Sequence, residues 1–101
     1  GIRDRRADAC LEHIADALEE FDPDEVDFTS TDGVLTIEFP DGARYVMNRQ
    51  TAASQMWFAA GARAWHYNWD GSAWVNDRDE HELGACVSTS ISEKIGRAIE
   101  L

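Results

Sequence analysis

Basic residues are scarce in this chain of 101 residues, which holds 9 lysines and arginines against 20 aspartates and glutamates. The formal net charge is therefore −11. Nucleic acids and anionic membrane surfaces are bound by clustered lysines and arginines, so neither is an expected partner. Long apolar runs are also missing, which excludes a membrane-spanning helix. The charge instead favours cations and basic proteins as partners.

Cysteine is scarce as well, because the chain has only Cys10 and Cys86. Two cysteines so far apart in the sequence cannot form a disulfide framework, and a reducing compartment fits this usage. Both lie on or beside apolar helix stripes, so we expect them in the core. No glycine-rich phosphate loop, CxxC or HExxH motif is present, and His13, His66 and His81 form no recognisable ligand set. The sequence therefore predicts no conventional catalytic centre.

Composition and length predict one domain over residues 1–101, since 44% of the residues are hydrophobic and 10% are aromatic. Apolar residues recur along residues 4–21 at three- and four-residue spacing, which predicts an amphipathic helix ended by Asp22 and Pro23. A second helix is predicted over 80–100, with Asp79 as its N-cap. The apolar stripe of the second helix consists of Leu83, Val87, Ile91, Ile95 and Ile99.

Short alternating segments joined by tight-turn sequences such as Asp32-Gly33 and Asp70-Gly71 predict antiparallel strands between the helices. The fold class is therefore α+β, a two-layer sandwich in which a sheet of five to six strands carries both terminal helices on one face. The other face of the sheet should meet solvent. The predicted strands cover residues 26–31, 34–39, 43–49, 55–60, 64–69 and 72–76.

Negative charge is concentrated at the start of the chain, because no lysine or arginine occurs between Ala7 and Ala43. On the first helix, carboxylates four positions apart are neighbours that repel one another by a few tenths of a kcal/mol per pair. Carboxylate oxygens suit hard cations, so this ladder predicts weak, multiple and poorly selective metal sites. The alternative is a solvated helix face that keeps the protein soluble. The ladder consists of Asp4, Asp8, Glu12, Asp16 and Glu20, with Glu19 adjacent.

The outer face of the predicted sheet carries one large aromatic side chain among polar ones. Alternation along residues 55–60 turns Met56 and Phe58 inward, which leaves Trp57 outward. A solvent-facing tryptophan ringed by amides is typical of a protein-binding anchor. The alternative is a register shifted by one residue, which would place Trp57 in the core. Its expected polar neighbours are Asn48, Gln55, His66 and Asn68.

From about Ala7 to Leu101 the order and spacing of several short motifs is similar to that of the frataxin family, known in bacteria as CyaY. The resemblance implies a frataxin-like sandwich and an iron-binding accessory role in iron–sulfur cluster assembly, as iron donor or as regulator of sulfur transfer. The motifs are Gly33-Val34-Leu35-Thr36-Ile37, Asn48-Arg49-Gln50, Gln55-Met56-Trp57-Phe58-Ala59, His66-Tyr67-Asn68-Trp69-Asp70-Gly71, Trp74-Val75 and His81-Glu82-Leu83.

The same resemblance implies two sets of site residues. An acidic ridge would bind Fe2+ or Fe3+, and a second set would face a complex of cysteine desulfurase and scaffold protein. The ridge consists of Asp8, Glu12, Asp16, Glu19, Glu20, Asp22, Asp24, Glu25 and Asp27. The partner-facing set consists of Asn48, Gln50, Gln55 and Trp57, with Arg49 beside them, and His66.

Other expectations also come from the resemblance. An alternative role is a ferroxidase and iron-storage protein, although the sequence has no Glu-x-x-His set of the di-iron type. A monomer is expected, with iron-dependent oligomers as the family's other state. His66 stands where many eukaryotic members carry arginine, which would make that contact pH-dependent. The motifs HYNW and HEL look closer to mitochondrial and alphaproteobacterial members, so the mitochondrial matrix is expected, with the bacterial cytoplasm as the alternative.

Overall fold

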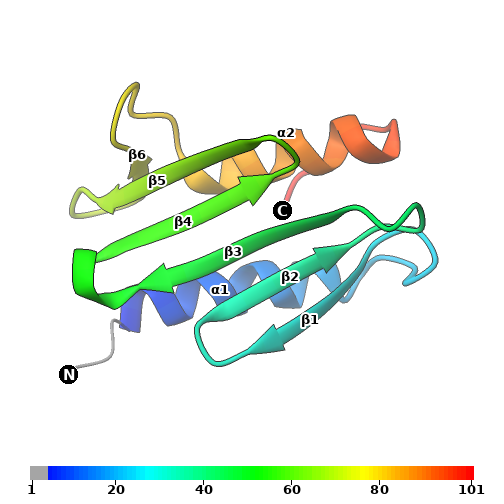
Figure 1. Ribbon diagram of the computed structural model, residues 1–101, viewed down its shortest axis with the longest axis horizontal. Helices are drawn as coiled ribbons and strands as arrows, with labels where there is room; N and C mark the ends of the chain where they lie inside the picture. Colours follow the sequence, from blue (N-terminus) through cyan, green and yellow to red (C-terminus); the bar gives the residue numbers. More distant parts are fainter. Residues whose placement is uncertain (1–4) are drawn as a thin grey trace.

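A computed structural model describes residues 5–101, so Asp4 and the start of the first predicted helix lie outside the described residues. Along the chain, one helix precedes six strands and a second helix follows them (Figure 1). A 3-10 helix, η1 (Thr51–Ala53), links the third and fourth strands. The elements are α1 (Arg5–Leu18), β1 (Asp27–Thr31), β2 (Val34–Glu38), β3 (Arg44–Gln50), β4 (Gln55–Ala60), β5 (Arg63–Trp69), β6 (Trp74–Asn76) and α2 (Leu83–Ile95).

The six strands form one antiparallel sheet in the order β1-β2-β3-β4-β5-β6. Both helices lie on the same face of this sheet and leave the other face uncovered (Figure 1). Tight turns enforce the sequential pairing, and the β1–β2 turn needs a glycine because Gly33 has φ +75°. The predicted two-layer α+β sandwich is thus confirmed, with six strands.

The core fills the space between the helices and the inner face of the sheet. Fully burying a leucine, isoleucine, methionine or phenylalanine side chain contributes about 1.5–3 kcal/mol relative to leaving it exposed. Cys10 and Cys86 are half-buried against this core, in agreement with the structural role expected for them. The core includes Leu11, Ile14 and Leu18 of α1, Leu35, Ile37, Met47, Met56, Phe58 and Tyr67 of the sheet, and Leu83, Val87 and Ile91 of α2.

The helix boundaries differ from the sequence expectation at several ends. The first helix ends at Leu18, before Phe21, because the chain turns there through hydrogen bonds such as that from the Phe21 N–H to the Leu18 carbonyl. Phe21 still packs against the core, which explains why its spacing resembled helix. Within residues 5–101, neither helix combines the length and the apolar character that crossing a bilayer requires.

The second helix begins at Leu83, and the prediction that Asp79 is its N-cap is wrong. The Glu82 carboxylate caps it by accepting a 2.9 Å hydrogen bond from the Ala85 N–H, whereas Asp79 accepts from the N–H of His81. Gly96, with φ 78°, ends the helix in the left-handed conformation. Ile99 therefore lies beyond the helix, although it still packs against the core.

The register of β4 follows the predicted alternation. Met56 and Phe58 are 0% and 1% exposed, and they face the helices. Trp57 lies on the opposite face, paired in register with Asn48 of β3 and His66 of β5. The alternative register, with Trp57 in the core, is therefore wrong.

This register predicts opposite consequences for two adjacent substitutions. Phe58→Ala should lower the free energy of unfolding by about 3–5 kcal/mol because it leaves a cavity in the core. Trp57→Ala should lower it by much less, because that side chain packs only on the outer face. Urea denaturation followed by circular dichroism measures both, and equal losses would contradict the register.

Candidate functional site

The acidic ridge runs along one edge of the molecule. It begins on α1 with Asp8, Glu12 and Asp16, continues through the connection that follows, and ends at Asp27, the first residue of the edge strand β1 (Figure 1). All its members are exposed except Asp8 and Glu25, which are partly buried. The fold thus keeps the whole predicted set on adjacent segments.

Asp8 is neutralised from within the molecule. The Arg49 guanidinium, on β3, forms an ion pair with the Asp8 carboxylate, and its Nη2 lies 3.5 Å from Oδ1 of Asp32. Arg49 is paired in register with Met56, so strand alternation turns it toward the helices. Arg49 therefore points away from the face that carries Asn48 and Gln50, the residues beside which the resemblance placed it.

Glu25 is neutralised by Arg97, which follows α2. The guanidinium donates two hydrogen bonds to the carboxylate, 2.6 Å from Nη2 to Oε1 and 3.1 Å from Nε to Oε2. This bonding and the positive charge hold the pKa of Glu25 below its ordinary value. The sequence offered no sign of either pair, because the partner residues are 41 and 72 positions away.

The other members of the ridge are exposed carboxylates. Two of them bind nearby backbone, since Asp22 Oδ1 accepts from the Asp24 N–H and Asp27 Oδ1 accepts from the Phe28 N–H, each at 2.9 Å. Across residues 5–101, no three aspartate, glutamate, histidine or cysteine side chains converge to hold a metal ion. The ridge can therefore offer a cation single carboxylates, which suit weak and exchangeable binding. Its exposed members are Glu12, Asp16, Glu19, Glu20, Asp22, Asp24 and Asp27.

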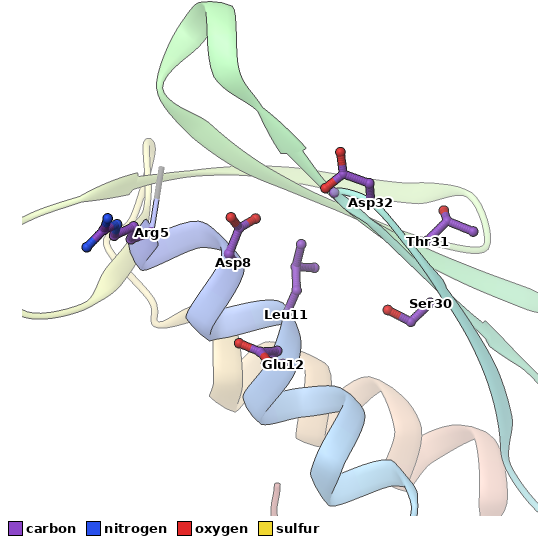
Figure 2. A pocket seen from close by; sticks show the side chains of 8 residues that line it. Arg5, Asp8, Leu11, Glu12, Ser30, Thr31 and Asp32 are labelled. Carbon is purple, nitrogen blue, oxygen red and sulfur yellow. The ribbon is translucent and has the colours of Figure 1, made fainter. Parts of the chain in front are cut away.

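A cleft of about 780 Å³ opens between α1 and the β1–β2 turn at the Asp8 end of the ridge. Figure 2 shows the α1 side chains across from the segment that carries Ser30, Thr31 and Asp32. Asp32 was predicted only as a turn residue, and its proximity to Arg49 is visible only in the structure. The lining residues are Arg5, Asp8, Leu11, Glu12, Ser30, Thr31, Asp32 and Gly33.

On the outer face, the Trp57 indole is held in place by polar neighbours. Its Nε1–H donates to Oε1 of Gln55 at 2.9 Å, and Nε2 of Gln55 donates to Oδ1 of Asn68 at 3.2 Å. The indole also stacks on the His66 ring, with centroids 4.4 Å apart and 20° between the planes. The aromatic surface is thus oriented before any partner arrives.

The other residues predicted on this face lie where strand alternation puts them. Asn48 is paired with Trp57, and Gln50 is paired with Gln55. Asp77 was not among the predicted site residues, and its Oδ2 lies 3.9 Å from Nδ1 of His66. Apart from Arg49, the structure therefore brings the predicted partner-facing set together on one uncovered sheet face.

The structure is thus a two-layer sandwich with an acidic edge and an oriented aromatic side chain on an uncovered sheet face. A family model described as a frataxin-like domain matches residues 4–97. The chain belongs to the frataxin family, as its motifs predicted.

Relatives with known names support this assignment. The chain is 42% identical over 96 residues to the iron-sulfur cluster assembly protein CyaY of Dechloromonas aromatica, covering 94% of this chain and 90% of the relative. It is 38% identical over 98 residues to the protein of the same name from Thioalkalivibrio sulfidiphilus, covering 94% and 92%. Both relatives are bacterial, so they do not support the mitochondrial location expected from the HYNW and HEL motifs.

Solved structures share the fold. The frataxin of Psychromonas ingrahamii superimposes with a TM-score of 0.84 at 26% identity, covering 93% of this chain and 89% of that one. A trimeric frataxin from Saccharomyces cerevisiae, complexed with ferrous iron, gives 0.81 at 27% identity, covering 96% and 91%.

The Glu25–Arg97 pair predicts a shift in carboxyl titration. In Arg97→Gln, the pKa of Glu25 should rise toward its ordinary value of 4.5. A depressed pKa in the folded state stabilises the protein above the ordinary value, and this contribution is lost as pH falls through the folded value. The variant should therefore lose less stability on acidification. Carboxyl-detected NMR titration measures the shift, with Arg63→Gln as a control that leaves Glu25 unchanged.

Proposed function

We propose that the protein is an iron-binding accessory protein of iron–sulfur cluster assembly, which docks on a cysteine desulfurase–scaffold complex as iron donor or regulator of sulfur transfer. The observation that carries the proposal is the preoriented Trp57 on a sheet face that neither helix covers. The names of the bacterial relatives support the pathway.

The docking role follows from the chemistry of the outer face. Tryptophan anchors with polar surroundings supply a large share of binding energy at protein interfaces. Here the indole N–H is already bonded to Gln55, so docking on Trp57 leaves no donor unsatisfied. The amides of Asn48 and Asn68 offer hydrogen bonds around the anchor. This surface therefore suits a protein partner better than a small molecule.

The iron role follows from the exposed part of the ridge. Separate carboxylates hold a hard cation weakly, and weak binding suits a cargo that must be passed on. The ferrous complex of the yeast frataxin supports iron as that cargo. Because no three candidate ligands converge within residues 5–101, we favour this binding role over ferroxidase chemistry, which needs irons held in fixed positions.

The location and the assembly state belong to the same proposal. We place the protein in a bacterial cytoplasm because its named sequence relatives are bacterial. We expect a monomer, since the outer face is polar around a single aromatic anchor. Size-exclusion chromatography with and without Fe2+ tests whether iron produces oligomers.

Trp57→Ala tests the docking surface. Loss of the anchor should weaken binding to a purified desulfurase–scaffold complex by about 2 kcal/mol or more, roughly 30-fold in Kd. Val46→Ala, on the same face, is the matched control and should leave affinity nearly unchanged. Biolayer interferometry measures both, and an unaltered Kd for correctly folded Trp57→Ala would refute the docking role.

A ridge with fewer carboxylates tests the iron role. The triple variant Asp16→Asn, Glu19→Gln and Glu20→Gln should bind Fe2+ more weakly in anaerobic calorimetry, because it removes three exposed carboxylates. The control triple removes the same charge elsewhere, at Asp77, Glu93 and Glu100. An equal loss of Fe2+ affinity in both triple variants would show that only net charge matters and would rule out a binding site on the ridge.

A further inference from the structure

The guanidinium of Arg49 lies in a mostly buried position next to Gly33. Its side chain is only 12% exposed, although it carries a permanent charge. Its backbone N–H donates to the Gly33 carbonyl at 2.8 Å. A Cβ added to Gly33 would lie 2.9 Å from Nη2 of Arg49, so the absence of a side chain there leaves room for the guanidinium.

The guanidinium joins two carboxylates from different elements. It forms an ion pair with Asp8 of α1 and lies 3.5 Å from Asp32 in the β1–β2 turn. A divalent cation bound by these carboxylates would need the same oxygen atoms. Arginine does not deprotonate in proteins, so it cannot give way by losing its charge. A cation at this end must displace Arg49 and leave its charge poorly solvated.

We propose that Arg49 is an internal counter-ion that keeps metal ions off the Asp8 end of the ridge and confines them to the exposed carboxylates from Asp16 to Asp24. The proposal rests on the iron-binding role and adds the residue that determines where on the ridge the metal binds. Arg49 thereby acts as a specificity residue that contacts no metal itself.

The ion pair at the other end of the ridge differs in burial. Arg97 is 55% exposed and Glu25 is 35% exposed, whereas the Asp8 side chain is 23% exposed and Arg49 is less exposed still. Exposed pairs are screened by water and salt and contribute little. Cations therefore compete easily with Arg97 for the Glu25 carboxylate and poorly with Arg49 for the Asp8 carboxylate. A substitution of Arg97 is thus a suitable control for a substitution of Arg49.

The test uses Mn2+ as an oxygen-preferring paramagnetic probe and records the broadening of amide NMR signals. In the wild type, broadening should be strongest for residues 16–24 and weaker for residues 8–11 and 30–33. Arg49→Met, which keeps an apolar stem, should increase the broadening of residues 8–11 and 30–33 to the level of residues 16–24 and tighten binding there about tenfold. Arg97→Met should leave the broadening of residues 8–11 and 30–33 unchanged. Asp8→Asn added to Arg49→Met should abolish the gain.

Other outcomes separate this proposal from the iron role. Broadening of residues 8–11 as strong as that of residues 16–24 in the wild type, or no difference between wild type and Arg49→Met, would overturn the Arg49 proposal and leave the iron role standing. No broadening along the ridge in any variant would overturn both. If Arg49→Met does not fold, Arg49→Lys serves instead, because lysine keeps the charge without the planar fork and should give an intermediate gain.

Discussion

The two-residue period of the strands is the constraint on which the rest of the structure depends. Both helices cover one face of the sheet, so the strand residues that face the helices are mostly apolar and the residues between them are left for solvent. Met56 and Phe58 satisfy the core, and Trp57 between them can then serve only the outer face. The same rule separates neighbouring residues of β3, with Asn48 outward and Arg49 inward.

Packing of α1 against the sheet offsets the repulsion along its acidic side. Like charges four residues apart cost a few tenths of a kcal/mol per pair, whereas each buried leucine or isoleucine contributes about 1.5–3 kcal/mol. The buried stripe of Leu11, Ile14 and Leu18 therefore dominates. Arg49 and Arg97 relieve the charge near the two ends of the ridge, and most of the exposed carboxylates lie between Asp8 and Glu25.

Short sequence patterns were sufficient to predict the fold, because its turns and strands depend on residues that are adjacent in the chain. The Asp32-Gly33 turn and the alternation around Trp57 each depend on a few adjacent residues, and both are found where they were expected. The start of α2 was misplaced because Asp79 and Glu82 are both carboxylates able to cap a helix. Tertiary contacts decide between them: Val75 forms a β-bridge with Glu82, which holds the chain extended until that residue.

The site was harder to predict, because tertiary contacts decide which of its carboxylates stay available. The density of acids along α1 was visible in the sequence, but which of them remain available depends on arginines from β3 and from the segment after α2. Pairings over 41 and 72 positions leave no periodic trace in the sequence. The outer face was easier, since its members follow from alternation once the strands are known.

The ridge lies on α1 and the segment after it, and α1 packs against the same sheet that carries Trp57, so no hinge separates the two surfaces. Consecutive residues of β3 reach the two surfaces, since the Asn48 side belongs to the Trp57 face and the Arg49 side contacts the ridge. The sheet is one strand layer thick and is backed by a packed core, so neither surface can shift independently of the other. Under the proposed function, a partner docked on Trp57 would therefore meet the acidic edge, and any cation held there, at a fixed distance and orientation. The fold would then supply positioning, and the chemistry of cluster assembly would belong to the partner.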